Sequence, residues 1–191
     1  MSTDADATGR DRLRWWSVPR DVLLVSGPDA AAYLQGQVSQ DVEAMEPGDS
    51  AASFVLQPSG KVDAWFRISR RDEDWVLDVD EGHGDALQAR LTRFLLRTDA
   101  TVEPLEWTMV AVRGDGAATV AAGAGDLVVD PGWPGVEGVD VLGADPQPPD
   151  AAEPGDREDL EGLRIEAGVP AMGAELDGDT IQRSAGLPAG R

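Results

Sequence analysis

The chain lacks cysteine, and its 191 residues include one histidine and one lysine. Without cysteine the protein cannot form disulfides, a thiol nucleophile, a thiolate metal site or the usual ligation of an iron-sulfur cluster. The single histidine, His83, stands between two glycines with no second histidine to complete a site, which is typical of a solvated loop. Redox chemistry is therefore not expected from this chain's own side chains.

Long apolar runs and basic residues are also scarce. No stretch is long enough to cross a bilayer, and residues 1–11 are small and polar, unlike a secretory leader. Sixteen basic residues face 36 acidic ones, so the net charge of −20 opposes attraction to phosphate backbones and anionic membranes. We expect a cytoplasmic protein with no membrane partner and no direct nucleic-acid partner.

What is present begins with a clear series of local signals. Residues 21–26 form an apolar, β-rich run, Gly27-Pro28-Asp29 is a helix-start pattern, and residues 30–37 continue as a helix. Residues 53–56 and 61–69 are two strand-like runs around Gln57-Pro58-Ser59-Gly60, which has the residue types of a type I turn. The sequence therefore predicts a strand, a helix and a hairpin.

The remaining signals predict helices on one face of antiparallel sheets, which is the α+β class. Further strands are expected at 75–79, 101–103, 107–112, 127–129 and 139–142, and helices at 85–97, 116–124 and 159–167. We divide the chain into a disordered tail at 1–12, an N-terminal α+β domain at 13–104 and a second α+β portion at 105–191. The second portion contains a proline-rich linker at 143–156 and an irregular C-terminus.

Three sets of side chains could bind a ligand. Alternation along 61–69 places Asp63, Trp65 and Arg67 on one face, where they could hold a flat heteroaromatic ring with an anionic tail, although a half-exposed sheet face carries the same residue types. Trp15 and Trp16 must point to opposite faces if they lie in a strand, so one could line a ligand or interdomain surface, unless both pack under loops. Three arginines at 90, 93 and 97 form a basic stripe that could attract a polyglutamate tail or simply complement the helix dipole.

Two stretches, residues 23–68 and LRIEAGVPAMGAEL at 163–176, resemble the glycine-cleavage T-protein-like superfamily and within it the folate-binding YgfZ-type branch. The resemblance implies a T-protein-like folate-binding fold, tetrahydrofolate as the cofactor and iron-sulfur proteins as partners. It also implies a role in supporting iron-sulfur enzymes, including those that modify tRNA. Arg164 stands where T-proteins place an arginine that approaches the folate, although it could instead pair with Glu161 on the helix surface.

The sequence departs from the T-protein pattern at two places. The adjacent aspartates that follow the hairpin turn in T-proteins align with Ala64 and Trp65, so the catalytic acid is not reproduced. The loop that carries a pterin-recognising glutamate aligns with residues 132–140, where Trp133 keeps the aromatic, Val136 replaces the glutamate and Glu137 could substitute for it. The alternative is that residues 132–140 form a loop with a structural role and no part in pterin recognition. These departures favour the YgfZ-type branch over a true aminomethyltransferase.

The motif K-G-C-Y-x-G-Q-E marks the YgfZ-type branch after a segment that TIQRSAGL at 180–187 partly resembles, and it does not occur before Arg191. We therefore expect a C-terminally shortened member of the branch. An aminomethyltransferase and a non-catalytic interaction module or degenerate paralogue stay open as alternatives. No catalytic residue and no metal ligand is assigned.

Overall fold

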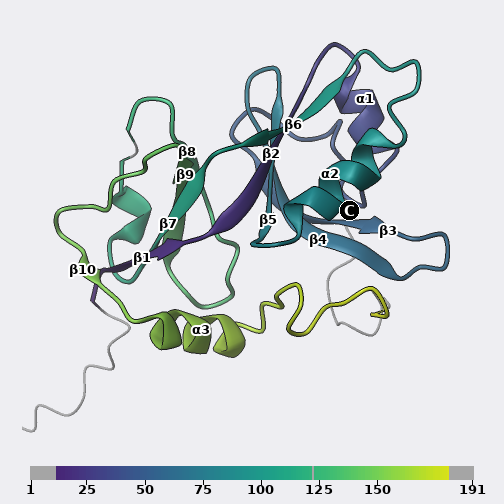
Figure 1. Ribbon diagram of the computed structural model, residues 1–191. Helices are drawn as coiled ribbons and strands as arrows, with labels where there is room; N and C mark the ends of the chain where they lie inside the picture. Colours follow the sequence, from purple (N-terminus) through teal and green to yellow (C-terminus); the bar gives the residue numbers. More distant parts are fainter. Residues whose placement is uncertain (1–11, 122, 181–191) are drawn as a thin grey trace, which may run out of the picture. The chain divides into compact units, whose positions relative to one another are not determined.

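The computed structural model describes residues 12–121 and 123–180, and the chain divides into two compact units (Figure 1). Among the described residues, unit 1 consists of 12–18 and 108–169, and unit 2 consists of 19–107 and 170–180. This division differs from the expected boundary at 104, because β1 (Arg14–Val18) pairs with β7 (Thr108–Arg113). Apart from Arg12, the expected tail lies outside the described residues, as does nearly all of the stretch at 180–187.

Unit 2 is built on a sheet in the order β3-β4-β5-β2-β6, in which every neighbouring pair is antiparallel. Its strands are β2 (Arg20–Ser26), β3 (Ser50–Leu56), β4 (Val62–Arg70), β5 (Trp75–Asp80) and β6 (Thr101–Leu105). Helices α1 (Ala30–Gln35) and α2 (Gly84–Thr92) cover one face of this sheet (Figure 1). Leu34 of α1 and Leu87 of α2 lie in one core with Phe66 and Leu77 from the strands. The expected α+β class is confirmed.

The hairpin between β3 and β4 forms as predicted. The Gly60 amide donates to the Gln57 carbonyl at 2.8 Å, which closes the turn. Gly60 has φ +81°, a conformation that glycine adopts without a Cβ clash. Pro58 and Gly60 are thus local signals that specify this turn.

Helix α2 ends earlier than expected, at Thr92 rather than near Arg97. Beyond Leu91 the backbone bonds shift to i−3 spacing, from Phe94 to Leu91 and from Leu95 to Thr92, so the last turn tightens. Leu95 still packs against the core, but Phe94 is exposed instead of buried on the apolar face. The stretch at 93–97 is therefore a surface turn.

Tyr33 connects the two helices of unit 2. It is buried, and its hydroxyl donates to the carbonyl of Leu91. Burial raises the pKa of Tyr33 to about 12, while the nearby Arg90 acts in the opposite direction and lowers the pKa. The neutral phenol is therefore part of the folded core.

Charged residues gather around Asp78 of β5, which is 1% exposed. Arg20 Nε donates to Asp78 Oδ1 at 3.0 Å, and Arg67 Nε donates to Asp78 Oδ2 at 2.8 Å. Arg20 also pairs with Asp80, whose Oδ2 accepts the Met172 amide at 2.8 Å. This network joins three strands and the segment at 170–176.

Unit 1 contains the second sheet, in the order β10-β1-β7-β9-β8. With β1 and β7 it comprises β8 (Leu127–Val129), β9 (Gly138–Gly143) and β10 (Glu153–Pro154), and β10 runs parallel to β1. The expected helix at 116–124 is only a 3₁₀ turn, η1 (Ala117–Thr119), because the next residue, Val120, has an extended backbone conformation that ends the helix. Helix α3 (Arg157–Glu166) follows the proline-rich stretch. None of the described helices is long and apolar enough to span a membrane.

Candidate functional site

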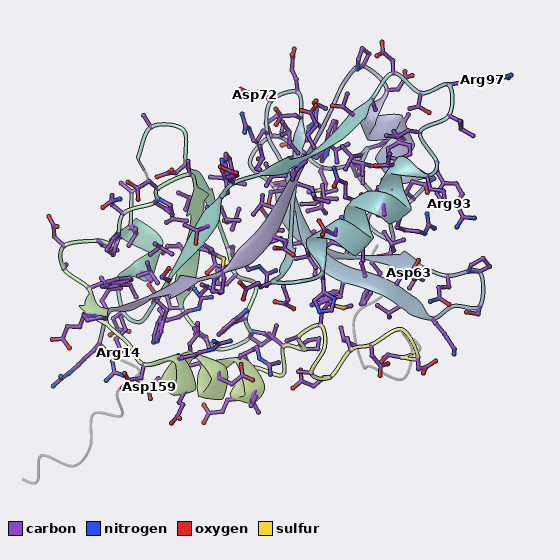
Figure 2. The ribbon with its side chains drawn as sticks, viewed as in Figure 1. Arg14, Asp63, Asp72, Arg93, Arg97 and Asp159 are labelled. Carbon is purple, nitrogen blue, oxygen red and sulfur yellow. The ribbon has the colours of Figure 1, made fainter. Side chains whose placement is uncertain are left out.

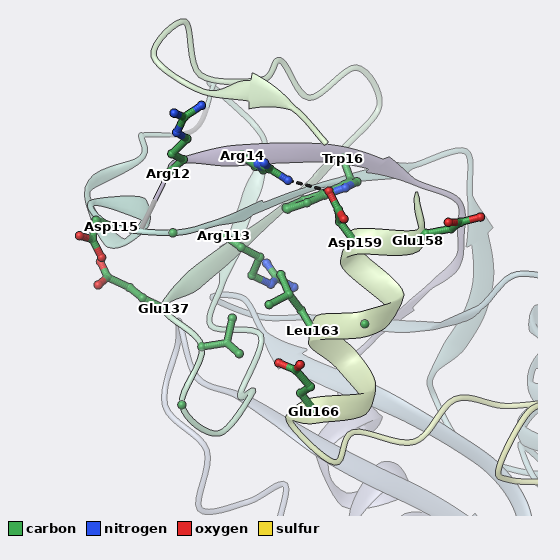
Figure 3. A pocket seen from close by; sticks show the side chains of 14 residues that line it. Arg12, Arg14, Trp16, Arg113, Asp115, Glu137, Glu158, Asp159, Leu163 and Glu166 are labelled. Atoms are coloured by element: carbon green, nitrogen blue, oxygen red, sulfur yellow. Dashed lines mark hydrogen bonds and ion pairs between the residues drawn. The ribbon is translucent and has the colours of Figure 1, made fainter. Parts of the chain in front are cut away.

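A cavity of about 610 Å³ lies within unit 1, between the sheet and α3 (Figure 3). Arg14 and Trp16 alternate along β1 and so point to the same face of the sheet. Arg113 of β7 lies directly opposite Arg14 in the antiparallel register. The other face carries Trp15, Val112 and the small apolar core, so the cavity is lined by the polar face of this sheet.

Helix α3 forms the opposite wall. Asp159, Leu163 and Glu166 recur at helical spacing and line the cavity together with Gly162. Two contacts attach the start of the helix to β1: Arg14 Nη1 donates to Asp159 Oδ2 at 2.6 Å, and Trp16 Nε1 donates to the Asp156 carbonyl at 2.8 Å. These contacts fix the helix over the sheet.

Gly155, just before α3, makes this close approach possible. A Cβ at Gly155 would lie 2.3 Å from Cε2 of Trp16, nearer than any real carbon contact. The backbone therefore lies directly on the indole ring, and no other residue would fit without moving Trp16. The indole, 5% exposed, becomes a rigid part of the cavity wall.

Arg113 is almost completely buried, at 2% exposure, and its charge is compensated locally. Its Nη1 donates to Asp140 Oδ1 at 2.7 Å and to the carbonyls of Val112 and Val139 at 3.0 Å each. Its guanidinium carbon lies 4.3 Å from the ring centre of Trp133, within cation–π range. Arg113 therefore serves as a fixed wall of the cavity rather than a mobile ligand.

Carboxylates outnumber guanidinium groups around the cavity. The lining includes three arginines, at 12, 14 and 113, and five acidic residues, at 115, 137, 158, 159 and 166. Arg14 is neutralised by Asp159 and Arg113 by Asp140, while Arg12 is mainly exposed. The interior is consequently better suited to hydrogen-bond donors or cations than to an anion.

Of the predicted site residues in unit 1, Glu137 lines the cavity, and its Oε1 accepts the Gly116 amide at 3.2 Å. Trp133 is used in stacking on Arg113. Arg164 does not line this cavity: its Nε and Nη2 bind both carboxylate oxygens of Glu161 at 2.9 and 2.6 Å, and its Nη1 donates to the Val169 carbonyl. The pairing with Glu161 that was the alternative for Arg164 is therefore present, although Arg164 is buried rather than on the helix surface.

The three predicted residues of unit 2 have different partners, and β4 has a bulge where β3 residues Val55 and Leu56 pair with Ala64 and Val62. Asp63 is the extra residue, and its carboxylate pairs with Arg90 Nε of α2 at 3.1 Å. Trp65 packs on Phe54 with ring centres 4.7 Å apart, and Arg67 is engaged by Asp78. Burial still alternates along β4, so each of the three predicted residues is more exposed than the residues between them, and a shared ligand site there stays a prediction.

Sequence reasoning missed Arg113, Asp159 and the role of Trp16 in the cavity. The adjacent tryptophans did indicate that one indole faces away from the core, which Trp16 does. Arg113 and Asp140 lie on different strands, so only the pairing of β7 with β9 brings them together. Within the described residues no group of three or more histidine or acidic side chains could hold a metal ion.

No protein-family model matches the chain. A probable aminomethyltransferase of Halobacterium salinarum is 34% identical over 134 residues, which is 63% of this chain and 37% of the relative. An IBA57 homologue from Mycosarcoma maydis, named as a mitochondrial iron-sulfur cluster assembly factor, is 28% identical over 140 residues, which is 65% of this chain and 35% of the relative. The chain thus spans little more than a third of these relatives' length.

The crystal structure of aminomethyltransferase T of the glycine cleavage system from Bartonella henselae superposes with a TM-score of 0.78. The match covers 90% of this chain and 55% of that chain, at 18% sequence identity. The fold is that of aminomethyltransferase T. The match includes residues of both units, and the expected T-protein-like fold is confirmed, whereas the identity is too low to transfer an activity.

Proposed function

We propose that this chain is a tetrahydrofolate-binding protein of the YgfZ type that supports iron-sulfur enzymes, including tRNA-modifying ones, in the cytoplasm. The observation that carries the proposal is a T-type fold over 90% of the chain, together with a partly open cavity of about 610 Å³ in unit 1. This volume is in the range of small-molecule sites. The sequence similarity to an iron-sulfur cluster assembly factor favours the supporting role over catalysis.

The donor pattern of a reduced pterin fits the lining of the cavity. Its 2-amino and ring N–H groups form a donor edge that one carboxylate can accept with both oxygens. Glu137 and Glu166 offer such carboxylates, and Trp16 offers an apolar wall for the flat ring. The glutamate tail would be disfavoured in the acidic interior and would extend towards Arg12, whose side chain is 73% exposed.

Aminomethyl transfer is not part of the proposal. Ala64, which aligns with an aspartate of T-proteins, is buried in the apolar core, and Trp65 packs on Phe54. A missing general acid or base typically lowers the rate about 10²- to 10⁴-fold. The similarity to a probable aminomethyltransferase makes the direct assay necessary: turnover of an aminomethylated lipoyl carrier with tetrahydrofolate should be absent, and a rate near that of a true T-protein would establish the enzyme instead.

Calorimetric titration with tetrahydrofolate tests binding, and Glu137→Gln tests the site. The substitution keeps the shape but removes a charge-assisted acceptor, so affinity should fall by roughly tenfold, about 1.5 kcal/mol. Glu103→Gln, on an exposed position of β6, is the matched control and should bind like the wild type. Folded protein that does not bind tetrahydrofolate would contradict the function, whereas binding unaffected by Glu137→Gln would contradict only its location.

Arg164→Ala and Trp65→Ala address the sites expected from the resemblance. Arg164 is engaged by Glu161 and Trp65 by Phe54, so we expect smaller losses than for Glu137→Gln. If Arg164→Ala lowers the affinity for tetrahydrofolate more than Glu137→Gln does, the folate site lies on the Arg164 side of α3.

A further inference from the structure

The turn that follows α2 in unit 2 exposes large apolar side chains. Leu96 is 86% exposed and Phe94 is 46% exposed, two of the four large hydrophobic residues exposed among those described. Their neighbours Leu91 and Leu95 pack inward, so the turn presents two side chains that the core does not use. We call Arg93, Phe94, Leu96 and Arg97 the Arg93 surface.

This surface is basic on an acidic protein. Residues 86–98 contain three arginines and no carboxylate, although the whole chain has a net charge of −20. Arg90 is engaged by Asp63 and lies 4.4 Å from the ring centre of Phe94. Arg93 and Arg97 point outward from unit 2 (Figure 2), and within residues 12–121 and 123–180 neither has an ion-pair partner.

The backbone at Arg97 is unusual. Arg97 has φ 64°, the only positive value among the described non-glycine residues. Helix ends commonly place glycine in this left-handed conformation because a Cβ is unfavourable there. Keeping a long cationic side chain at such a position is a form of local strain that is concentrated at functional sites.

We propose that the Arg93 surface docks an acidic protein segment in which carboxylates flank an apolar side chain. The two arginines supply charge complementarity, and Leu96 with Phe94 supplies the apolar contact. A free small anion would leave Leu96 in water, and an extended polyanion such as duplex DNA or an anionic bilayer would be repelled by the rest of the molecule. The surface lies in unit 2 and does not depend on folate binding.

The test uses a fluorescent twelve-residue peptide with glutamates on both sides of a Leu-Phe pair, and the same peptide with glutamine in place of glutamate. Fluorescence anisotropy at low salt should show binding of the glutamate peptide, with affinity falling as salt is added. Arg93→Glu combined with Arg97→Glu should weaken binding at least about tenfold, and Leu96→Ser should weaken it several-fold. All three positions are exposed, and circular dichroism confirms that the variants fold.

Arg157→Glu is the matched control, since it reverses an exposed charge in unit 1 that does not line the cavity. It should leave peptide affinity unchanged. Absence of binding, equal binding of the glutamine peptide, an equal loss in Arg157→Glu, or tighter binding of anionic vesicles or duplex DNA at the same residues would each overturn the proposal.

Discussion

Unit 2 is stabilised internally by different kinds of contact from those inside unit 1. The main core of unit 2 contains seventeen buried residues, drawn from both helices, all five strands and the segment after α1, whereas the core cluster behind β7 and β9 in the described part of unit 1 contains five. In unit 1 the buried pair Arg113–Asp140 and the bonds from Arg14 and Trp16 to the start of α3 hold the cavity walls in place. Apolar burial therefore dominates unit 2, while polar contacts of fixed direction hold the walls of the cavity in unit 1.

Removal of one buried charge in each unit should give the largest effects. Asp78→Asn leaves Arg20 and Arg67 without their shared counter-charge and should cost about 3–5 kcal/mol of unfolding free energy. Asp140→Asn affects one arginine and should cost roughly 3 kcal/mol. Urea denaturation measures both, with Glu153→Gln at the exposed Arg12 pair as a control worth at most about 1 kcal/mol. Losses below about 1 kcal/mol at both sites would show that the ion pairs matter little.

Matched valine substitutions compare the two cores directly. Val79→Ala in unit 2 should cost roughly 2–3 kcal/mol, because many packed neighbours prevent the site from collapsing. Val141→Ala in unit 1 should cost roughly 1–2 kcal/mol, less than Asp140→Asn on the adjacent residue. Hydrogen exchange of the amides in β5 and β9 assigns each loss to its unit. If Val141→Ala destabilises more than Asp140→Asn, polar contacts do not dominate unit 1.

Tyr33 is the only tyrosine, so its ultraviolet titration reports on unit 2 alone. Tyrosinate absorbance should appear with a midpoint near 12 in the folded protein, and near 10 in denaturant. Because the folded pKa is raised, the associated stability is complete below pH 10 and is lost as the pH rises through 12. Arg90→Gln should raise the folded midpoint further, since Arg90 lowers this pKa. A folded midpoint near 10 would mean that Tyr33 is not buried.

Salt should produce the smallest and most general effect. Unit 1 has 16 acidic and 6 basic residues, and unit 2 has 20 acidic and 10 basic residues, so each unit has a net charge of −10. Unit 1 has 80 residues and unit 2 has 111, so the negative charge per residue is higher in unit 1. Repulsion is screened as the Debye length falls from about 30 Å at 0.01 M to about 3 Å at 1 M salt. The melting temperature should rise with NaCl, and amides of β7 and β9 should gain more protection than those of β5. A flat or falling melting temperature would contradict this.

Local signals explain why unit 2 was largely predictable. Pro58 and Gly60 specify the hairpin turn, and the spacing of Leu87 and Leu91 specifies the buried face of α2. The features that the sequence did not predict depend on contacts between separate strands. The bulge at Asp63, whose carboxylate pairs with Arg90, depends on how β3 and β4 pair, and no residue type in the strand predicts it.

Unit 1 was less predictable because its cavity is assembled from distant parts of the chain. Arg113 meets Asp140 only through strand pairing, and Arg14 meets Asp159 across 145 positions. Single-sequence patterns contain no information about such pairs. Glu137 could be identified because the resemblance singled out its loop, whereas Arg113 had no corresponding signal.

The pairing of β1 with β7 has a consequence for synthesis on the ribosome. Trp16 aligns with Ala111, 95 positions later, so β1 must wait for its partner strand while the intervening chain is made. At about 5–20 residues per second this wait lasts roughly 5–20 s. During that time Trp15 and Trp16 emerge on an unpaired strand, the kind of nascent segment that chaperones protect from aggregation.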